Sequence, residues 1–134
     1  MAVYTISTEL EQIAKDVIAE MEDLKHLDDP GLRIAFQYSD QKKKNKDREV
    51  FADTETIKEK LKMFVHYDFL ITFYEPNCIG LDEEHLKRLM YHELKHVGYD
   101  PEHRKFSIIP HDMEDFRDCV EKWGVNWIYS EGEE

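Results

Sequence analysis

Apolar positions recur at helical spacing near the start of the chain. Thr8 followed by Glu11 is typical of a helix N-terminus, where each side chain caps a backbone N–H of the other. The apolar residues then return every three or four positions, at Leu10, Ile13, Val17, Met21 and Leu24. The pattern therefore predicts a helix over residues 8–26, which the turn-forming segment "DDPG" ends.

Segments rich in β-branched and aromatic residues follow. "LRIAFQYS" (32–39) alternates apolar residues with others and predicts a strand. "YDFLITFYE" (67–75) is so dense in strand-forming residues that we expect the best-buried strand there. "REVFADT" (48–54) fits a second short strand or a sheet edge. Between them, "TIKEKLKMFV" (56–65) carries apolar residues at helical spacing and predicts a short helix.

The signals of a helix start and stop also frame residues 83–97. Asp82 stands where an N-cap residue would, and Gly98 fits the C′ position just past the end. The following stretch, residues 99–110, combines Pro, Asp and charged residues and predicts a loop with a few extended positions.

A last helix is predicted from about residue 111 to residue 123, before Gly124. Together these elements predict an α/β (α+β) fold, in which a short mixed sheet packs against helices. The length of 134 residues suits a single domain over 1–134. A Lys-rich loop at 41–48 and an acidic tail at 130–134 complete the predicted organisation.

Charge narrows the classes of partner. The net charge of −12 argues against binding to nucleic acid or to an anionic membrane surface. The basic cluster "QKKKNKDR" (41–48) stands alone in an acidic chain and is more typical of a solvated loop. The apolar runs are too short to span a bilayer, and "MAVYTISTEL" does not resemble a signal peptide. We expect a cytoplasmic protein, and the sequence sets no oligomeric state.

The segment "YHELKHVGYD" (91–100) holds the candidate chemistry. His92 and His96 are four residues apart, so on a helix they lie on one face and can grip one Zn²⁺ ion. Glu93, rotated by about 100° from His92, would reach past the metal toward its bound water. Zinc lowers the pKa of such a water to about 7, and the carboxylate can take its proton.

The HExxH motif alone is weak evidence for a metal site, because a random reordering of a chain with seven histidines contains it roughly one time in twenty. The position of Glu93 around the helix is stronger evidence. Glu93 lies in the middle of an apolar arc, and His92 and His96 lie at its edge. The arc consists of Leu86, Leu89, Met90 and Val97, and the opposite side carries Lys87, Arg88, Tyr91 and Lys95. A buried carboxylate needs compensation, which a metal-bound water would supply. The alternative is that the histidines are partly exposed and Glu93 pairs with a buried cation.

A third metal ligand should come from downstream. His111, in "PHDMEDF", is the first candidate because it would be held at the start of a helix. Glu114, one turn later, is the second candidate, and His103, in a polar loop, is the third. Asp112 could accept a hydrogen bond from a ligand imidazole.

"LDEEHLKRLMYHELKHVGYD" followed by "FSIIPHDMEDFRDCVEKWG" resembles the phage metallopeptidase family, over about residues 8–127. The resemblance implies a small zincin-like domain in which His92 and His96 bind the metal and Glu93 is the catalytic base. It implies His111 as the third ligand. The family pattern has two glutamates where this chain has Glu114 and an aspartate, which keeps both acids. It also implies a phage or prophage origin.

The expected function is therefore a zinc-dependent metallopeptidase acting on a peptide or protein substrate. Tyr99, Tyr91 and His103 are candidate helpers that would stabilise the oxyanion. An extended substrate could pair with "YDFLITFYE" or with its neighbouring strand. One alternative is an acidic binding or inhibitor protein that mimics DNA, either stabilised by zinc or free of metal. A second is a zincin that keeps the fold without turnover.

Overall fold

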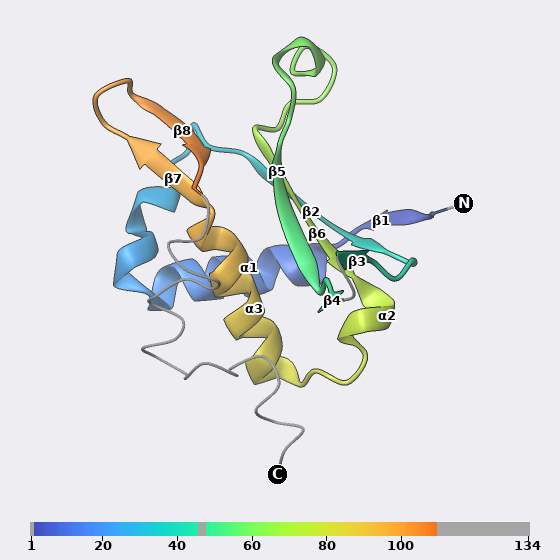
Figure 1. Ribbon diagram of the computed structural model, residues 1–134. Coiled ribbons are helices and arrows are strands. Elements are labelled where there is room, and N and C mark those ends of the chain that lie inside the picture. Colours follow the sequence, from blue (N-terminus) through green and yellow to red (C-terminus); the bar gives the residue numbers. More distant parts are fainter. Residues whose placement is uncertain (1, 46–47, 110–134) are drawn as a thin grey trace.

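The computed structural model describes residues 2–45 and 48–109, and these form a mixed α+β structure (Figure 1). The fold class predicted from the sequence is confirmed. The main sheet has four strands in the order β1-β2-β6-β5. Its members are β1 (Tyr4–Ile6), β2 (Ile34–Ser39), β6 (Phe69–Tyr74) and β5 (Ala52–Thr56). The pair β2–β6 is parallel, and the other two pairs are antiparallel.

Strand β6 is the most buried strand of this sheet, as its composition predicted. Ile71 and Phe73 have no exposed surface, and Phe69 retains only 2%. These three residues alternate along the strand and therefore share one face of the sheet. The helices α1 (Thr8–Glu20) and α3 (Glu83–Lys95) lie on the same side of the sheet in Figure 1, and their apolar residues join this core.

Helix α1 begins at residue 8 as predicted, but its capping residue lies one position before the Thr8 of the predicted Thr8–Glu11 pair. The N-cap is Ser7, whose hydroxyl accepts a hydrogen bond from the backbone N–H of Leu10 at 3.0 Å. The helix ends at Glu20 rather than at residue 26, because Met21 takes an extended conformation. A 3₁₀ helix, η1 (Glu22–Leu27), then follows and buries Leu24 and Leu27.

The helix predicted over residues 56–65 is wrong. Thr56 still belongs to β5, and the only helical turn described there is the 3₁₀ helix η2 (Glu59–Leu61). Met63 and Phe64 are 81% and 79% exposed. A helix this short gains most of its stability from packing its apolar face, and Met63 and Phe64 are not covered by any of the residues that the structure describes.

The segment after α3 is a β-hairpin and not the predicted loop. It consists of β7 (Val97–Asp100) and β8 (Lys105–Ile108), which pair antiparallel. The prediction that Gly98 ends the helix at C′ is also wrong, because Gly98 lies within β7. A Cβ there would stand 1.9 Å from Cδ1 of Ile109, so glycine lets the Ile109 side chain pack closely on β7, and it does not mark a helix stop.

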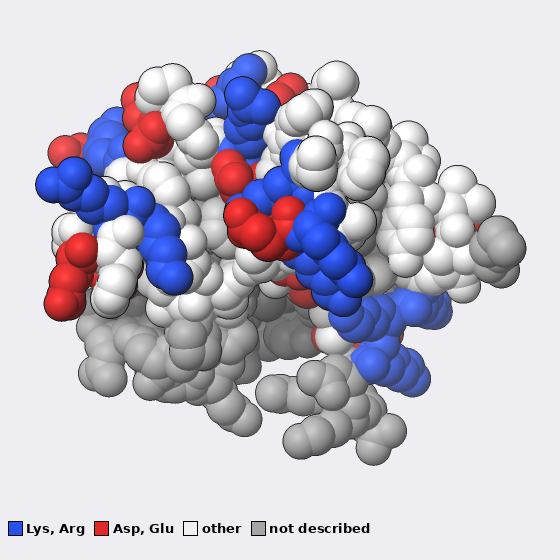
Figure 2. Space-filling view, turned by 90° about the horizontal axis from the view of Figure 1, so that it is seen from above, with Lys and Arg blue, Asp and Glu red and all other residues white. Residues whose placement is uncertain are grey.

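The short elements β3 (Lys44–Asn45), β4 (Arg48–Glu49) and α2 (Glu75–Cys78) complete the described chain. Acidic and basic side chains are interspersed on the face seen in Figure 2. Among the ion pairs of the described residues, Lys62 pairs with both Glu59 and Asp68. None of the helices in residues 2–45 and 48–109 has the length and hydropathy needed to cross a membrane. The predicted last helix and the acidic tail lie outside the described residues.

Candidate metal centre

Helix α3 presents the candidate metal-binding side chains near its C-terminal end. The helix begins as predicted, with the Asp82 carboxylate accepting a hydrogen bond from the backbone N–H of His85 at 2.8 Å. The same carboxylate also contacts Nδ1 of the buried His85 ring. His85 therefore takes part in the cap of its own helix. The helix ends at Lys95, and His96 is its C-cap residue.

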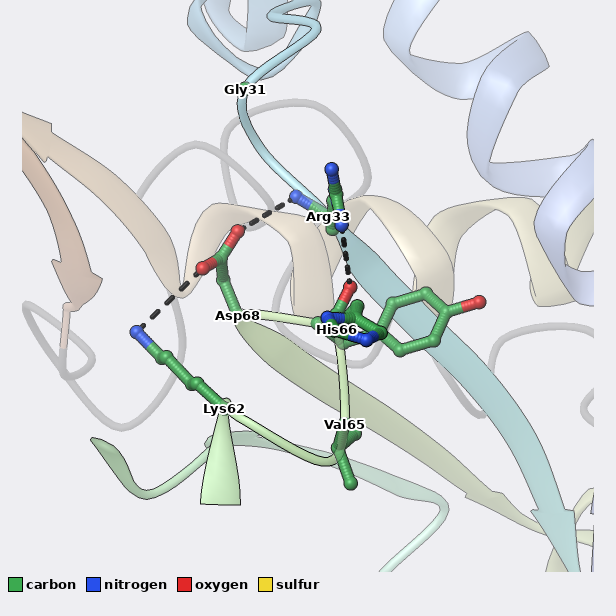
Figure 3. Close-up of a pocket in the computed structure, with 7 residues that line it drawn as sticks. Gly31, Arg33, Lys62, Val65, His66 and Asp68 are labelled. Atoms are coloured by element: carbon green, nitrogen blue, oxygen red, sulfur yellow. Dashed lines mark hydrogen bonds and ion pairs between the residues drawn. The ribbon is translucent and has the colours of Figure 1, made fainter. Parts of the chain in front are cut away.

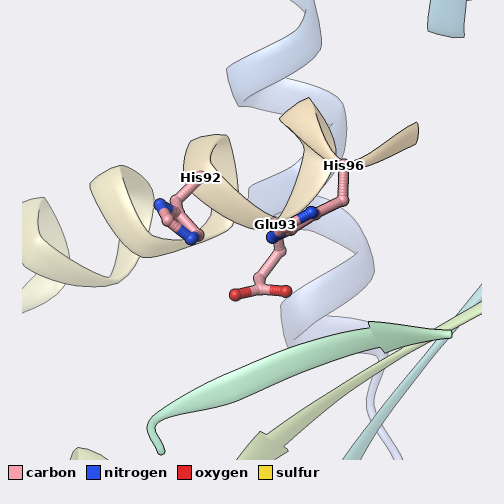
Figure 4. A group of neighbouring side chains, drawn as sticks. All are labelled: His92, Glu93 and His96. Atoms are coloured by element: carbon pink, nitrogen blue, oxygen red, sulfur yellow. The ribbon is translucent and has the colours of Figure 1, made fainter. Parts of the chain in front are cut away.

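His92, Glu93 and His96 form one cluster, which we call the α3 cluster (Figure 4). One candidate ligand atom from each residue lies within 4.8 Å of the others. The two imidazole rings are 5.4 Å apart between centroids and nearly perpendicular, at 74°. This is the arrangement expected when residues four apart on a helix turn toward a common point.

Glu93 is buried, as its place in the apolar arc predicted, with 3% of its surface exposed. Its carboxylate points toward strand β5 in Figure 4. There the hydroxyl of Thr54 donates a hydrogen bond to Oε1 at 2.7 Å. The same hydroxyl is 3.2 Å from the backbone carbonyl of Glu93. Thr54 therefore supplies part of the compensation that a buried carboxylate requires.

His96 is oriented by the backbone of Ile109. Its Nδ1 lies 2.7 Å from the carbonyl oxygen of Ile109, which can only accept a hydrogen bond. Nδ1 therefore carries a proton, and in the neutral ring Nε2 keeps its lone pair. In return, the backbone N–H of Ile109 donates to the carbonyl of His96 at 2.6 Å. A carbonyl that fixes the tautomer in this way is typical of histidines that bind metals.

The donor set of the α3 cluster fits a zinc ion. Two imidazoles are ligands that zinc prefers, and the carboxylate beside them is placed to act on a water bound to the ion. Zinc needs about four ligands, so at least one more protein ligand is expected. The predicted candidates His111 and Glu114, and the predicted partner Asp112, lie outside the described residues and stay predictions.

The other candidate residues are placed in different surroundings. His103 lies in the exposed β7–β8 turn, where its Nδ1 donates to the Asp100 carboxylate at 2.6 Å. Tyr99 is 43% exposed, and its ring packs against Phe106 at 5.0 Å. Neither residue is part of the α3 cluster. As oxyanion helpers, both remain sequence-based predictions.

The sequence places Tyr91 on the polar side of the helix, where an exposed side chain is expected, but the structure buries it. It has no exposed surface, and its hydroxyl donates to the carboxylate of Asp23 in η1. On the helix it lies about 160° away from Glu93. We therefore leave Tyr91 out of the proposed mechanism below.

Sequence reasoning did not identify Thr54 or the carbonyl of Ile109. Thr54 alternates with Ala52 and Thr56 on one face of β5, so a period-two pattern in "ADTET" could have placed it facing the helices. A backbone carbonyl leaves no such signal in the residue types.

A separate hollow lies beside the start of β6 (Figure 3). Its polar groups already contact each other: Asp68 accepts a hydrogen bond from the backbone N–H of Arg33 and pairs with Lys62. Arg33 also reaches the carbonyl of His66. None of its lining residues belongs to the α3 cluster, which keeps the α3 cluster as the candidate centre.

Comparison with models of protein families gives a match, over residues 2–131, to the family described as "Putative phage metallopeptidase". Neither the curated proteins nor the solved structures contain a match to the chain. The matched range includes β5, α3 and the segment with the predicted third ligand.

Proposed function

Because the chain belongs to the "Putative phage metallopeptidase" family, we propose that it is a zinc-dependent peptidase whose centre is the α3 cluster. The observation that carries this proposal is the placement of a buried carboxylate within 4.8 Å of two imidazoles on one helix. His92 and His96 would hold the ion through ring nitrogens. The third ligand would be His111, with Glu114 as the second choice.

When bound, a zinc ion at this position supplies Lewis-acid chemistry, by making water acidic and polarising the substrate carbonyl. Glu93 accepts the proton that the attacking water loses and passes it to the leaving nitrogen of the cleaved peptide bond. Burial of Glu93 keeps bulk water away from this proton transfer, and Thr54 holds the carboxylate toward β5. His96 keeps one tautomer through the Ile109 carbonyl.

The substrate would be an extended peptide or protein segment, added to the sheet at β5. Of the two strands considered from the sequence, β6 lies inside the sheet between β2 and β5, whereas β5 is the terminal strand in the order. An extended peptide can add to such an edge through its backbone. The acidic charge of the protein makes nucleic acid an unfavourable partner. We place the activity in the cytoplasm of a phage-infected or prophage-carrying host.

The test is the substitution Glu93→Gln, which keeps the shape of the side chain and removes its basicity. Metal content is measured on the purified protein, and cleavage is measured with casein and a peptide library. We expect the wild type to hold about one zinc ion per chain and to cleave, and Glu93→Gln to hold zinc and lose at least about 100-fold in kcat. A wild type without metal would overturn the proposal. Bound zinc without cleavage by the wild type would favour a zincin that has lost turnover.

A further inference from the structure

Thr54 combines two features that the proposed function treats separately. Its side chain faces the helices and donates to the Glu93 carboxylate at 2.7 Å. Its main chain lies in the middle of β5, the last strand of the main sheet. One residue therefore touches both the candidate base and the sheet edge.

The register of β5 against β6 shows where the main chain of Thr54 points. The backbone N–H of Tyr74 donates to Phe51, and that of Ile57 donates to Asp68, so these are hydrogen-bonded pairs. In an antiparallel ladder such pairs alternate with non-bonded pairs. The even-numbered residues Ala52, Thr54 and Thr56 therefore direct their N–H and C=O groups away from β6.

This outer edge is open within the part of the chain that the structure describes. The sheet order gives β5 no strand partner other than β6. A groove of about 550 Å³ between β8 and the start of β6 reaches this strand at Thr56, its last residue.

The position of β5 is fixed from its other face. Asp53, next to Thr54, accepts a hydrogen bond from the Tyr74 hydroxyl at 2.8 Å and pairs with Lys43 at 2.5 Å. Burial and this carboxylate raise the pKa of Tyr74 to about 12, so its hydroxyl remains a donor at neutral pH. A side chain on such an anchored strand holds a defined position.

We propose that Thr54 positions the base Glu93. We also propose that Thr54 binds the substrate and so aligns the substrate with Glu93. Its hydroxyl fixes the Glu93 carboxylate, while its main-chain N–H and C=O bind the extended substrate at the same point of the strand. The backbone of the substrate and the carboxylate that serves it are then held by one residue. The inference rests on the proposed function.

The test compares Thr54→Val, which keeps the branched shape and removes the hydroxyl, with Thr54→Ser, which keeps the hydroxyl. In the zinc-loaded protein we expect Thr54→Val to lower kcat about 10- to 100-fold, because a misplaced catalytic group costs about that much. KM should stay within about threefold, because both variants keep the main chain. Thr54→Ser should restore most of kcat. Thr5→Val, the same change at an exposed position of β1, is the matched control.

Zinc affinity and thermal unfolding separate positioning from a loss of structure. We expect Thr54→Val to bind zinc as the wild type does. In the metal-free protein, Thr54→Val should lower the unfolding midpoint when Glu93 is present, and should not lower it in a Glu93→Met background.

The inference is overturned if Thr54→Val keeps the wild-type kcat, if Thr54→Ser is no better than Thr54→Val, or if zinc affinity falls together with kcat. Additive shifts of the unfolding midpoint would also overturn it. If the wild type cleaves nothing, the proposed function fails, and the unfolding measurements alone decide whether Thr54 holds Glu93.

Discussion

Two groups of histidine and acidic side chains lie close together in the chain and differ in their surroundings. The first is the α3 cluster, and the second consists of Asp100, Glu102 and His103 in the β7–β8 turn. In both groups the candidate ligand atoms lie within 4.8 Å of one another. Distance between ligand atoms therefore does not distinguish a metal centre from an ordinary surface turn.

The partners of the side chains do distinguish them. In the turn, His103 donates to Asp100, and this bond holds the pKa of the exposed Asp100 carboxyl below its ordinary value. The imidazole and the carboxylate there satisfy each other. In the α3 cluster, the described partners of Glu93 and His96 are a hydroxyl and a backbone carbonyl. These two neutral groups fix the orientation of their side chains, and Glu93 is buried, whereas Glu102 and His103 of the turn are exposed.

The difference between the two groups is tested most directly by removing an imidazole, and the largest effect is expected in the α3 cluster. We expect His92→Ala or His96→Ala to weaken zinc binding at least about 100-fold, because each deletes one of about four ligands. The affinity is measured by competition with a chromophoric chelator. Equal zinc affinity in His96→Ala and the wild type would contradict the assignment.

A smaller effect is expected from the packing behind His96. In Gly98→Ala, the added methyl group would overlap the side chain of Ile109, whose carbonyl orients His96. We expect zinc affinity to fall about 10-fold, and the free energy of unfolding to fall by about 1–3 kcal/mol. Calorimetry on zinc-loaded and metal-free protein measures both. An unchanged zinc affinity together with a lower stability would show that Ile109 does not tune the centre.

Tyr91→Phe separates the two sides of α3. The change removes the hydroxyl that donates to Asp23, so we expect a loss of about 1 kcal/mol in the free energy of unfolding. Cleavage by the folded protein should stay within about twofold of the wild type, because Tyr91 lies about 160° from Glu93 on the helix. A large fall in kcat at unchanged stability would return Tyr91 to the list of oxyanion helpers.

The smallest effect is expected in the β7–β8 turn. His103→Ala removes the imidazole from an exposed turn, where its side chain is 64% exposed. We expect zinc affinity and stoichiometry to match the wild type within about twofold, since exposed pairs of this kind contribute little. Loss of one bound zinc per chain in this variant would make the turn a metal site and would remove the contrast between the groups.

The sequence predicted best where local patterns and packing agree. Asp82 capped its helix, and the position of Glu93 on the wheel correctly implied burial. The short helix predicted at 56–65 was wrong, because Met63 and Phe64 stay exposed among the described residues and so contribute little packing there. The prediction that Gly98 marks the helix end was wrong, because glycine is favoured both at a helix end and where segments pack closely. Thr54 was missed because its role depends on which strand lies across from α3, which only tertiary structure fixes.

His96 closes α3, and this location has an electrical consequence. The peptide dipoles of a helix add along its axis and leave about half a negative charge at the C-terminal end. His92 and the C-cap residue His96 stand in that last turn. The end of the helix therefore repels anions and favours a cation by about 0.3–1 kcal/mol. The direction of α3 therefore favours a positively charged ligand at this end, in addition to any contribution from the metal-binding side chains.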